Sequence, residues 1–208
     1  MKQVVHIVDD DRSYRNATAR LLTAYGLKVE AYESGDHFLT CLPSGEPGCV
    51  LLDLQMPGRS GLQVQRELRE RAPLLPIVFL TGEGDIKASV EAMKAGAEDF
   101  LEKRSTAAVL VATIERALSL CERRRAEHER IQERRTLLAS LSVREAEVLA
   151  LVIRGKLNKQ MAYALGISER TVKVHRHRVL EKLGVKSVAE VIAMAASAGP
   201  FERQVDRA

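Results

Sequence analysis

The sequence predicts two domains of different class. The first is a doubly wound α/β domain on a five-stranded parallel sheet, and one long helix joins it to an all-α domain of four helices. In the first half, short apolar runs alternate with amphipathic helical patterns, which is typical of a parallel sheet covered on both faces. The second half of the sequence shows helical patterns alone. We expect the first domain over 1–119, a charged helical linker over 120–139, the second domain over 140–199 and a tail over 200–208.

Five apolar runs are expected to form the sheet. In chain order they are VVHIV (4–8), LKVEAY (27–32), CVLLDL (49–54), PIVFL (76–80) and EDFLE (98–102). Helical patterns lie between them near 11–25, 35–42, 61–72 and 85–95. Gly26 and Gly96 are placed to end two of these helices. Because the loops at the carboxyl ends of parallel strands converge, a ligand of this domain is expected there.

The long helix is predicted over 106–138, which holds neither Gly nor Pro. Its second half is very polar, at CERRRAEHERIQERR. A heptad seam through Arg124 and Ile131, with His128 beside it, is too polar for a strong coiled coil. We therefore interpret this part as a solvated connector in preference to a dedicated zipper.

Capping signals divide the remaining chain into short helices. Ser142 and Glu145 form a capping box at the start of the first helix. Asn158 is expected to cap the second helix and Ser168 the third. An apolar segment over 188–196 predicts the last helix.

The composition excludes several classes of protein. With 46% hydrophobic and 29% charged residues among 208, the chain is typical of a folded globular protein. It has no apolar run near the roughly 18 to 20 residues that a membrane-spanning helix needs, and no secretion signal at its start. We therefore expect a cytoplasmic protein with no membrane partner. The three cysteines lack metal-ligand spacing and are expected to be reduced.

Positive charge is concentrated towards the end of the chain. Residues 140–208 carry 12 Lys and Arg against 7 Asp and Glu, whereas residues 1–119 carry 14 against 17. This asymmetry indicates a basic module that binds a polyanion, attached to a module with a different task.

Acidic side chains follow two strands of the predicted sheet. Asp9 and Asp10 come after the first strand, and Asp53 lies in the third. Carboxylates brought together there repel one another unless a cation lies among them, and a few open oxygen ligands suit Mg²⁺. Thr81 and Lys103, at two further strand ends, add a hydroxyl and an ammonium. In such a site an aspartate can attack phosphorus while the product oxygens are neutralised.

Several motifs at these strand ends resemble the receiver domain of bacterial two-component response regulators, which has a flavodoxin-like fold. They are VDDD (8–11), LLDLQMPGRSG (51–61), FLTGEGD (79–85) and AMKAGAEDFLEK (92–103). The resemblance implies that Asp53 accepts a phosphoryl group from a sensor histidine kinase. It also implies that Asp10 binds Mg²⁺ directly, that Asp9 does so through water, and that the backbone carbonyl of Gln55 is a further ligand.

The resemblance implies roles for three more residues of the first domain. Thr81 and Lys103 would hold the phosphoryl oxygens, and Phe100 stands where the family has its switching aromatic, although it fits a core aromatic equally well. Such a domain assists only its own phosphorylation and dephosphorylation, so we do not expect an enzyme. Arg104 follows Lys103 where the family usually has proline. The bond between them is expected to be either trans with a reshaped loop or cis and strained.

The segment NKQMAYALGISERTVKVHRHRVLEKLG has the helix, Gly-containing turn and helix of a helix-turn-helix. A rotation of about 100° per residue places Val172, Val179 and Leu183 on one face of its second helix. The other face and its margins carry Arg170, Val174, His177, Lys173 and Arg178. This distribution suits a recognition helix that packs on its own domain and enters the major groove. An amphipathic surface helix with solvated basic residues is the alternative.

Residues 140–197 resemble the output domain of the NarL/FixJ (LuxR-type) transcription regulators, notably at LSVREAEVLALVIRGKLNKQMA and ISERTVKVHRHRVLEKLGVKS. TGEGDI in the first domain favours the FixJ-like branch. The resemblance implies that Lys173, Val174 and His177 face bases. The remaining DNA-binding candidates, which would touch phosphates or border the reading face, are Arg170, Arg178, Thr171, Ser168, Asn158 and Lys159. His175 and Arg176 fall nearer the packed side and are expected to be structural.

Together the two resemblances imply a DNA-binding transcriptional regulator that is switched by phosphorylation of Asp53. We expect an activator that forms a homodimer when phosphorylated, reads an inverted repeat in double-stranded promoter DNA and contacts RNA polymerase. Two alternatives stay open. One is a phosphorylation-independent DNA-binding regulator with a relic receiver, and the other is a receiver enzyme or relay whose basic tail binds RNA or protein.

Overall fold

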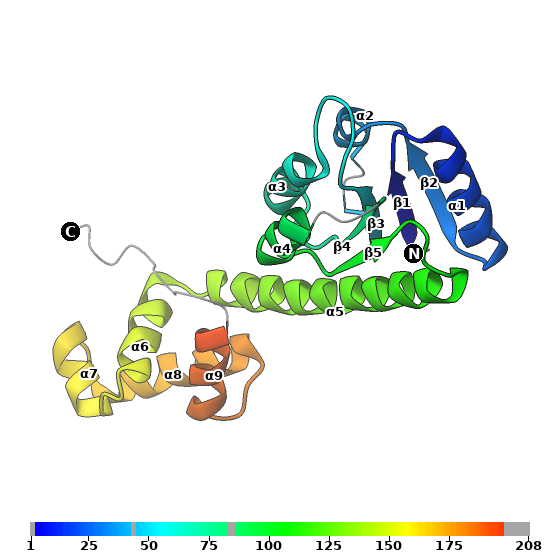
Figure 1. The fold of residues 1–208 in the computed structure, drawn as a ribbon. Helices are drawn as coiled ribbons and strands as arrows, with labels where there is room; N and C mark the ends of the chain where they lie inside the picture. The colour runs from blue at the N-terminus through cyan, green and yellow to red at the C-terminus, as the bar shows by residue number, and fades with distance from the viewer. Residues whose placement is uncertain (1–2, 43–44, 83–85, 198–208) are drawn as a thin grey trace. The chain divides into compact units, whose positions relative to one another are not determined.

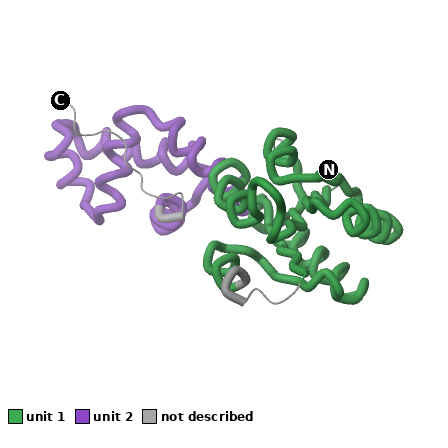
Figure 2. The backbone as a smooth tube through the Cα atoms, turned by 45° about the horizontal axis from the view of Figure 1, so that its top comes forward, with its two compact units in different colours: residues 1–126 green, residues 127–208 purple. Residues whose placement is uncertain are grey.

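The computed structural model of the chain describes residues 3–42, 45–82 and 86–197. The chain divides into two units, residues 1–126 and 127–208 (Figure 2). The division falls within the segment 120–139 that we interpreted as a connector. Each unit has hydrophobic clusters of its own, so each has the core that an independent domain needs.

The first unit is built on a five-stranded sheet with the strand order β2-β1-β3-β4-β5, in which all neighbouring strands are parallel. The strands are β1 (Val4–Val8), β2 (Lys28–Tyr32), β3 (Gly48–Asp53), β4 (Ile77–Thr81) and β5 (Asp99–Glu102). The three central strands are buried throughout, which explains their continuous apolar runs. The predicted sheet is confirmed, and each strand begins and ends within one residue of its predicted run.

Helices cover both faces of the sheet (Figure 1). One face packs against α2 (Gly35–Thr40), α3 (Gly61–Arg71) and α4 (Ile86–Lys94). The other face packs against α1 (Arg12–Ala24) and the first part of α5 (Ala107–Ala139). This arrangement confirms the doubly wound α/β fold.

Helix α5 is 33 residues long, close to the length predicted for it. Its first part is held against the sheet, where Ile114, Ala117 and Cys121 are fully buried. The backbone N–H of Gly48 also donates a hydrogen bond to Cys121 Sγ at 3.4 Å. The packing of α5 on the sheet therefore extends as far as Cys121.

After α5, the described residues of the second unit form four short helices, as predicted. They are α6 (Val143–Ile153), α7 (Asn158–Leu165), α8 (Glu169–Leu183) and α9 (Val188–Ser197). The capping box is confirmed: the Glu145 N–H donates to Ser142 Oγ at 3.3 Å, and the Ser142 N–H donates to Glu145 Oε2 at 2.8 Å. Ser168 caps α8 through the Thr171 N–H at 3.1 Å, also as predicted.

The predicted cap of α7 is wrong. Leu157 is the cap residue, and its N–H donates to Gln160 Oε1 at 2.9 Å. Asn158 is the first residue inside the helix, and its Oδ1 accepts a hydrogen bond from Arg176 Nη1 at 2.5 Å. The Gln160 side chain satisfies a free N–H at this helix start, while the Asn158 side chain is held by Arg176 of α8, 18 residues further along the chain.

Cys41, Cys49 and Cys121 are all free thiols. Within the described residues, no helix combines the length and the hydropathy that crossing a membrane requires. Among the same residues every peptide bond is trans, including the one between Lys103 and Arg104. The expected trans bond is therefore the observed one, whereas a reshaped loop stays a prediction.

Replacing Glu145 is expected to make the second unit less stable in a pH-dependent way. The hydrogen bonds from Lys182 Nζ, at 2.7 Å, and from the Ser142 N–H lower the pKa of Glu145 to about 2. A lowered pKa means that this stability is present above the ordinary pKa of 4.5 and is lost as the pH falls through about 2. Glu145→Gln is expected to cost about 1.5 kcal/mol at pH 7, as for a hydrogen bond to a charged group.

Denaturant unfolding of the full chain, followed by circular dichroism at several pH values, measures this effect. The matched control is Glu147→Gln, which removes an exposed ion pair with Arg144 at 2.9 Å. A pH-independent loss of stability in Glu145→Gln, equal to that of the control, would contradict the assignment.

Candidate functional site

Three carboxylates meet at the carboxyl ends of β1 and β3. Asp9 and Asp10 directly follow β1, and Asp53 is the last residue of β3, the neighbouring strand. One oxygen from each residue lies within 4.8 Å of the other two. Asp9 and Asp53 are buried, whereas Asp10 is exposed. The sheet therefore produces an acidic pocket with one side open to solvent, at the edge where the sequence predicts it.

Lys103 connects the two buried carboxylates of this pocket. Its Nζ lies 2.9 Å from Asp53 Oδ2 and 2.8 Å from Asp9 Oδ2. The backbone aids this placement, because the Lys103 N–H donates to the Thr81 carbonyl at 2.8 Å and so fastens the end of β5 to the end of β4. With Arg104 in the usual place of a proline, Lys103 still reaches both aspartates.

The other predicted pocket residues occupy different positions around Asp53. Thr81 is buried at the end of β4. Gln55 is exposed, and its N–H donates to Asp53 Oδ1 at 3.2 Å. Phe100 on β5 is half-buried against the hydrophobic cluster that β5 shares with α2, α3 and α4. Asp11 is the cap of α1, accepting hydrogen bonds from the N–H groups of Ser13 and Tyr14.

Helix α8 has the two faces that the sequence predicts. Its buried residues are Val172, Val179 and Leu183. The exposed candidates on α8 and at its cap are Ser168, Arg170, Lys173, Val174, His177 and Arg178, while Thr171 is partly buried. Lys159 is exposed at the start of α7. The surface that α7 and α8 offer to solvent is therefore basic, and its contact with DNA stays a prediction.

Two residues of α8 that we expected to be structural lie as predicted. Arg176 is partly buried and donates to Asn158 on α7. His175 is partly buried as well, with Nδ1 inaccessible to solvent. The hydrogen bond from Arg176 occupies the Asn158 carbonyl oxygen, which leaves the NH₂ group of that side chain as its donor end.

Both halves of this geometry match known families. Residues 5–115 match the response regulator receiver domain, and residues 139–195 match the bacterial regulatory proteins of the luxR family. The response regulator protein TodT of Pseudomonas putida is 43% identical over 91% of this chain and 83% of its own length. The transcriptional regulatory protein FixJ of Rhizobium meliloti is 40% identical over 94% of this chain and 96% of its own length.

The chain belongs to the FixJ-like branch of the NarL/FixJ response regulators. Solved structures agree with this assignment. The response regulator StyR matches with a TM-score of 0.82 and 42% identity over 94% of this chain and 99% of its own. Full-length FixJ from B. japonicum matches with a TM-score of 0.59 and 36% identity over 96% and 98%. The first unit contains the receiver, and the second contains the LuxR-type DNA-binding output domain.

The pKa values in the receiver pocket reflect burial and one shared cation. Burial raises the pKa of Asp9 and of Asp53, although the hydrogen bonds and charge of Lys103 act in the opposite direction. For Lys103 burial lowers the pKa, but the hydrogen bonds to Asp9 and Asp53 outweigh that effect and raise it. The ammonium therefore stays charged, and the two carboxylates would gain from a second cation.

The residues present fit the Mg²⁺ ion that receiver domains generally bind. Mg²⁺ prefers carboxylate oxygens together with several waters, and the exposed Asp10 keeps the pocket open to water. Asp9, Asp10 and Asp53 supply oxygens close enough to share one ion. The raised pKa values of Asp9 and Asp53 mean that burial disfavours their charged forms, and the positive charge of a divalent ion would stabilise those forms.

Sequence reasoning missed two residues that shape this pocket. Lys103 Nζ lies 4.9 Å from the centroid of the Tyr14 ring, and Arg15 Nη1 donates to the Asp9 carbonyl at 2.6 Å. Both residues lie in the first turn of α1. Their contacts with Lys103 and Asp9 depend on how α1 packs beside the strand ends, so no local pattern in the sequence marks these two residues.

Mg²⁺ is expected to raise the thermal stability of the receiver, because an ion that binds only the folded state stabilises it by mass action. At 100 times its dissociation constant the gain is about 2.7 kcal/mol. Asp10→Asn removes an expected ligand and should weaken Mg²⁺ binding about 10- to 100-fold. Losses of this size follow even the removal of a residue that only hydrogen-bonds to a metal ligand, so the loss of a ligand should be at least as large. Glu70→Gln, an exposed change on α3, is the control.

Scanning calorimetry with Mg²⁺ and with a chelator measures this gain. An equal gain in Asp10→Asn and in the unmodified chain would contradict the assignment of Asp10 as a ligand.

Proposed function

We propose that the chain is a transcriptional activator that a sensor histidine kinase switches on by phosphorylating Asp53. The observation that carries this proposal is the position of Lys103, whose ammonium contacts both Asp53 and Asp9. In a pocket that no longer accepts a phosphoryl group, nothing would require Asp53 to stay buried beside the Lys103 ammonium, which is placed to bind a phosphoryl oxygen as well. The intact pocket thus favours the phosphorylated switch over the phosphorylation-independent alternative.

In the proposed reaction an Asp53 carboxylate oxygen attacks the phosphorus atom of a phosphohistidine. The new O–P bond forms as the N–P bond breaks, and the imidazole leaves with the bonding electron pair. Mg²⁺, when bound, supplies positive charge to the phosphoryl oxygens. Lys103 neutralises a further oxygen and the Thr81 hydroxyl donates to another. Asp9, Asp10 and the Gln55 carbonyl would hold the ion.

The added charge on Asp53 is proposed to draw Thr81 and Lys103 inward and to let Phe100 follow. Phe100 lies on β5, so its movement would alter the surface formed by α4 and β5. Two exposed apolar residues of α4, Val90 and Met93, are each 47% accessible. Asp99 on β5, a strand that α4 contacts, forms an exposed ion pair with Arg116 on α5 at 2.7 Å. Exposed apolar side chains on α4 support dimerisation through this surface.

The homodimer would bind an inverted repeat with two α8 helices about 34 Å apart. It binds more tightly than a monomer because the second contact is intramolecular. In this proposal Lys173, Val174 and His177 read bases. The residues that touch phosphates are Asn158, Lys159, Ser168, Thr171 and Arg178. RNA polymerase at the promoter, in the cytoplasm, would be the last partner.

Asp53→Asn is expected to abolish phosphorylation by acetyl phosphate in the presence of Mg²⁺, because the amide is not a nucleophile. It should therefore also abolish the phosphate-dependent dimer and the gain in DNA affinity. Intact mass, sedimentation and gel retardation follow the three steps. Glu70→Gln, which changes an exposed carboxylate of α3, should behave like the unmodified chain. Phosphate-dependent DNA binding that persists in Asp53→Asn would refute the proposal.

Two lysines of the output domain are expected to affect DNA binding differently. Lys173→Ala should relax sequence preference by about 1–3 kcal/mol at one position of the site, because it removes a base contact. Lys159→Ala should weaken binding to all sequences and reduce the salt slope by about 1, because it removes a phosphate contact. Titrations of matched and scrambled duplexes at several salt concentrations separate the two, and identical behaviour of the variants would exclude these roles.

A further inference from the structure

The loop of residues 54–61 between β3 and α3 leads away from the phosphoryl acceptor. Its ends are joined by the Gly61 N–H, which donates to the Leu54 carbonyl at 3.1 Å. At Gly61 an added Cβ would overlap the Asp53 carbonyl, so the loop returns close to the acceptor. Gln55, whose carbonyl is the proposed Mg²⁺ ligand, lies at the start of this loop. The position of that ligand therefore depends on how the loop is held.

The loop packs on the start of α2. Gly35 is the first residue of α2, and a Cβ added there would lie 3.4 Å from the Arg59 carbonyl and 3.6 Å from Met56 Cε. Met56 is almost fully buried. The missing side chain also makes room for Val64 of α3, whose Cγ2 would overlap a Cβ added at Gly35. Ser60 at the end of the loop is held by its N–H, which donates to Gln63 Oε1 at 2.9 Å, whereas Pro57 and Gly58 in the outer part are exposed.

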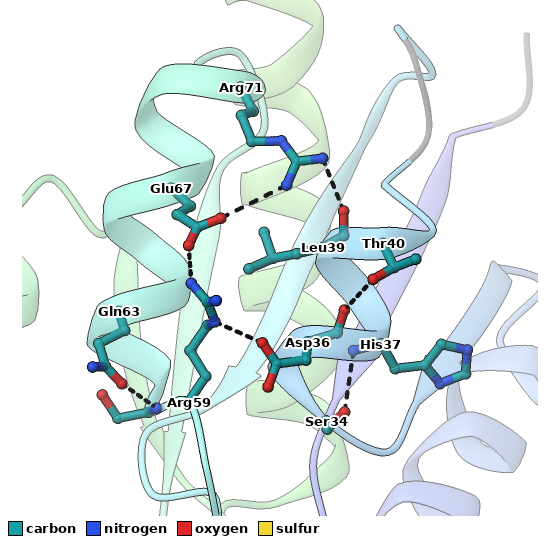
Figure 3. A network of polar contacts seen from close by, with 10 residues as sticks. Ser34, Asp36, His37, Leu39, Thr40, Arg59, Gln63, Glu67 and Arg71 are labelled. Atoms are coloured by element: carbon teal, nitrogen blue, oxygen red, sulfur yellow. Dashed lines mark hydrogen bonds and ion pairs between the residues drawn. The ribbon is translucent and has the colours of Figure 1, made fainter.

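Arg59 supplies an anchor for that outer part. Its side chain lies between α2 and α3 (Figure 3). Arg59 Nε donates to Asp36 Oδ1 on α2 at 2.7 Å, and Arg59 Nη1 contacts Glu67 Oε1 on α3. Arg59 thus connects the loop with both helices that flank it.

Arg71 belongs to the same network but contacts different residues. Its Nη1 lies 3.7 Å from Glu67 Oε2, and its Nη2 donates to the Leu39 carbonyl of α2 at 2.9 Å. Within the described residues Arg71 thus connects α3 with α2 and bonds to no residue of the loop. It provides a control of the same chemistry in the same network.

We propose that Arg59 is a positioning residue for the phosphorylation pocket: by fastening the loop to Asp36 and Glu67, it holds the Gln55 carbonyl ready for Mg²⁺. The proposal rests on the proposed function of the pocket. A ligand that is already in place does not have to be ordered when the ion binds, so a fixed loop raises Mg²⁺ affinity.

The exposure of the network sets the size and the salt dependence of the effect. The side chains of Arg59 and Glu67 are 36% and 37% accessible, and that of Asp36 is 63% accessible. Ion pairs with such exposure are individually weak and are screened by salt. The contribution of Arg59 to Mg²⁺ affinity is therefore modest at low salt and decreases at high salt.

The test compares Arg59→Gln, Arg59→Lys and Arg71→Gln in the full chain. Titration calorimetry at low salt is expected to show about five- to tenfold weaker Mg²⁺ binding for Arg59→Gln, as for two exposed ion pairs. Arg71→Gln should bind Mg²⁺ like the unmodified chain, and Arg59→Lys should recover part of the loss because it keeps the charge. At about 1 M salt, where the Debye length is about 3 Å, the difference should nearly disappear.

Two further readouts separate positioning from general stability. Amide hydrogen exchange over 55–59 should be faster in Arg59→Gln than in Arg71→Gln. With acetyl phosphate, Arg59→Gln should raise the Mg²⁺ concentration for half-maximal phosphorylation and leave the rate at saturating Mg²⁺ unchanged.

Unchanged Mg²⁺ affinity and unchanged loop exchange in Arg59→Gln would overturn the inference while leaving the proposed function intact. Equal losses in Arg59→Gln and Arg71→Gln would also overturn it, because they would indicate a general effect of the network. If the unmodified chain bound no Mg²⁺ and took up no phosphoryl group, the proposed function would fail. Loop exchange would then still decide whether Arg59 orders residues 55–59.

Discussion

The shared contact of Lys103 with Asp9 and Asp53 is the interaction on which the receiver pocket depends. Two buried carboxylates at neighbouring strand ends repel each other and are costly to desolvate, and both effects oppose the charge that a phosphoryl acceptor needs. The ammonium, at 2.8 and 2.9 Å from them, offsets part of this cost without closing the pocket. The site is therefore held together but remains short of positive charge, a state in which a metal ion binds favourably.

The backbone determines where this contact forms. Parallel pairing aligns Val8 with Leu52 and Asp53 with Leu80, so the carboxyl ends of β1, β3 and β4 lie at one edge of the sheet. Sequence alone predicts this alignment, because buried parallel strands appear as continuous apolar runs and their ends are marked by polar residues. It also predicts the apolar face of α8, since a helical period leaves few choices for Val172, Val179 and Leu183.

Sequence reasoning failed where a side chain finds a partner far along the chain. Asn158 has the chemistry of a helix cap, yet its oxygen is taken by Arg176, and Gln160 satisfies the helix start in its place. Tyr14 beside Lys103 and Arg59 beside Asp36 are contacts of the same kind. Local periodicity contains no information on such pairs, because they depend on how separate helices pack. Strand ends were predictable because the sheet itself brings them together.

Two different kinds of interaction consequently hold the pocket, one on each side. On the β5 side, a partly buried ammonium and the backbone hydrogen bond from Lys103 to Thr81 set a geometry that salt affects less. On the α2 and α3 side, exposed ion pairs hold the loop that carries Gln55, and these respond to salt and to neighbouring charges. Charge neutralisation at Asp53 is thus a stable property of the fold, whereas metal affinity is adjustable through Arg59. The proposed role of Arg59 thus allows sequence changes at the loop to alter Mg²⁺ affinity without a change of Asp53, the proposed phosphoryl acceptor.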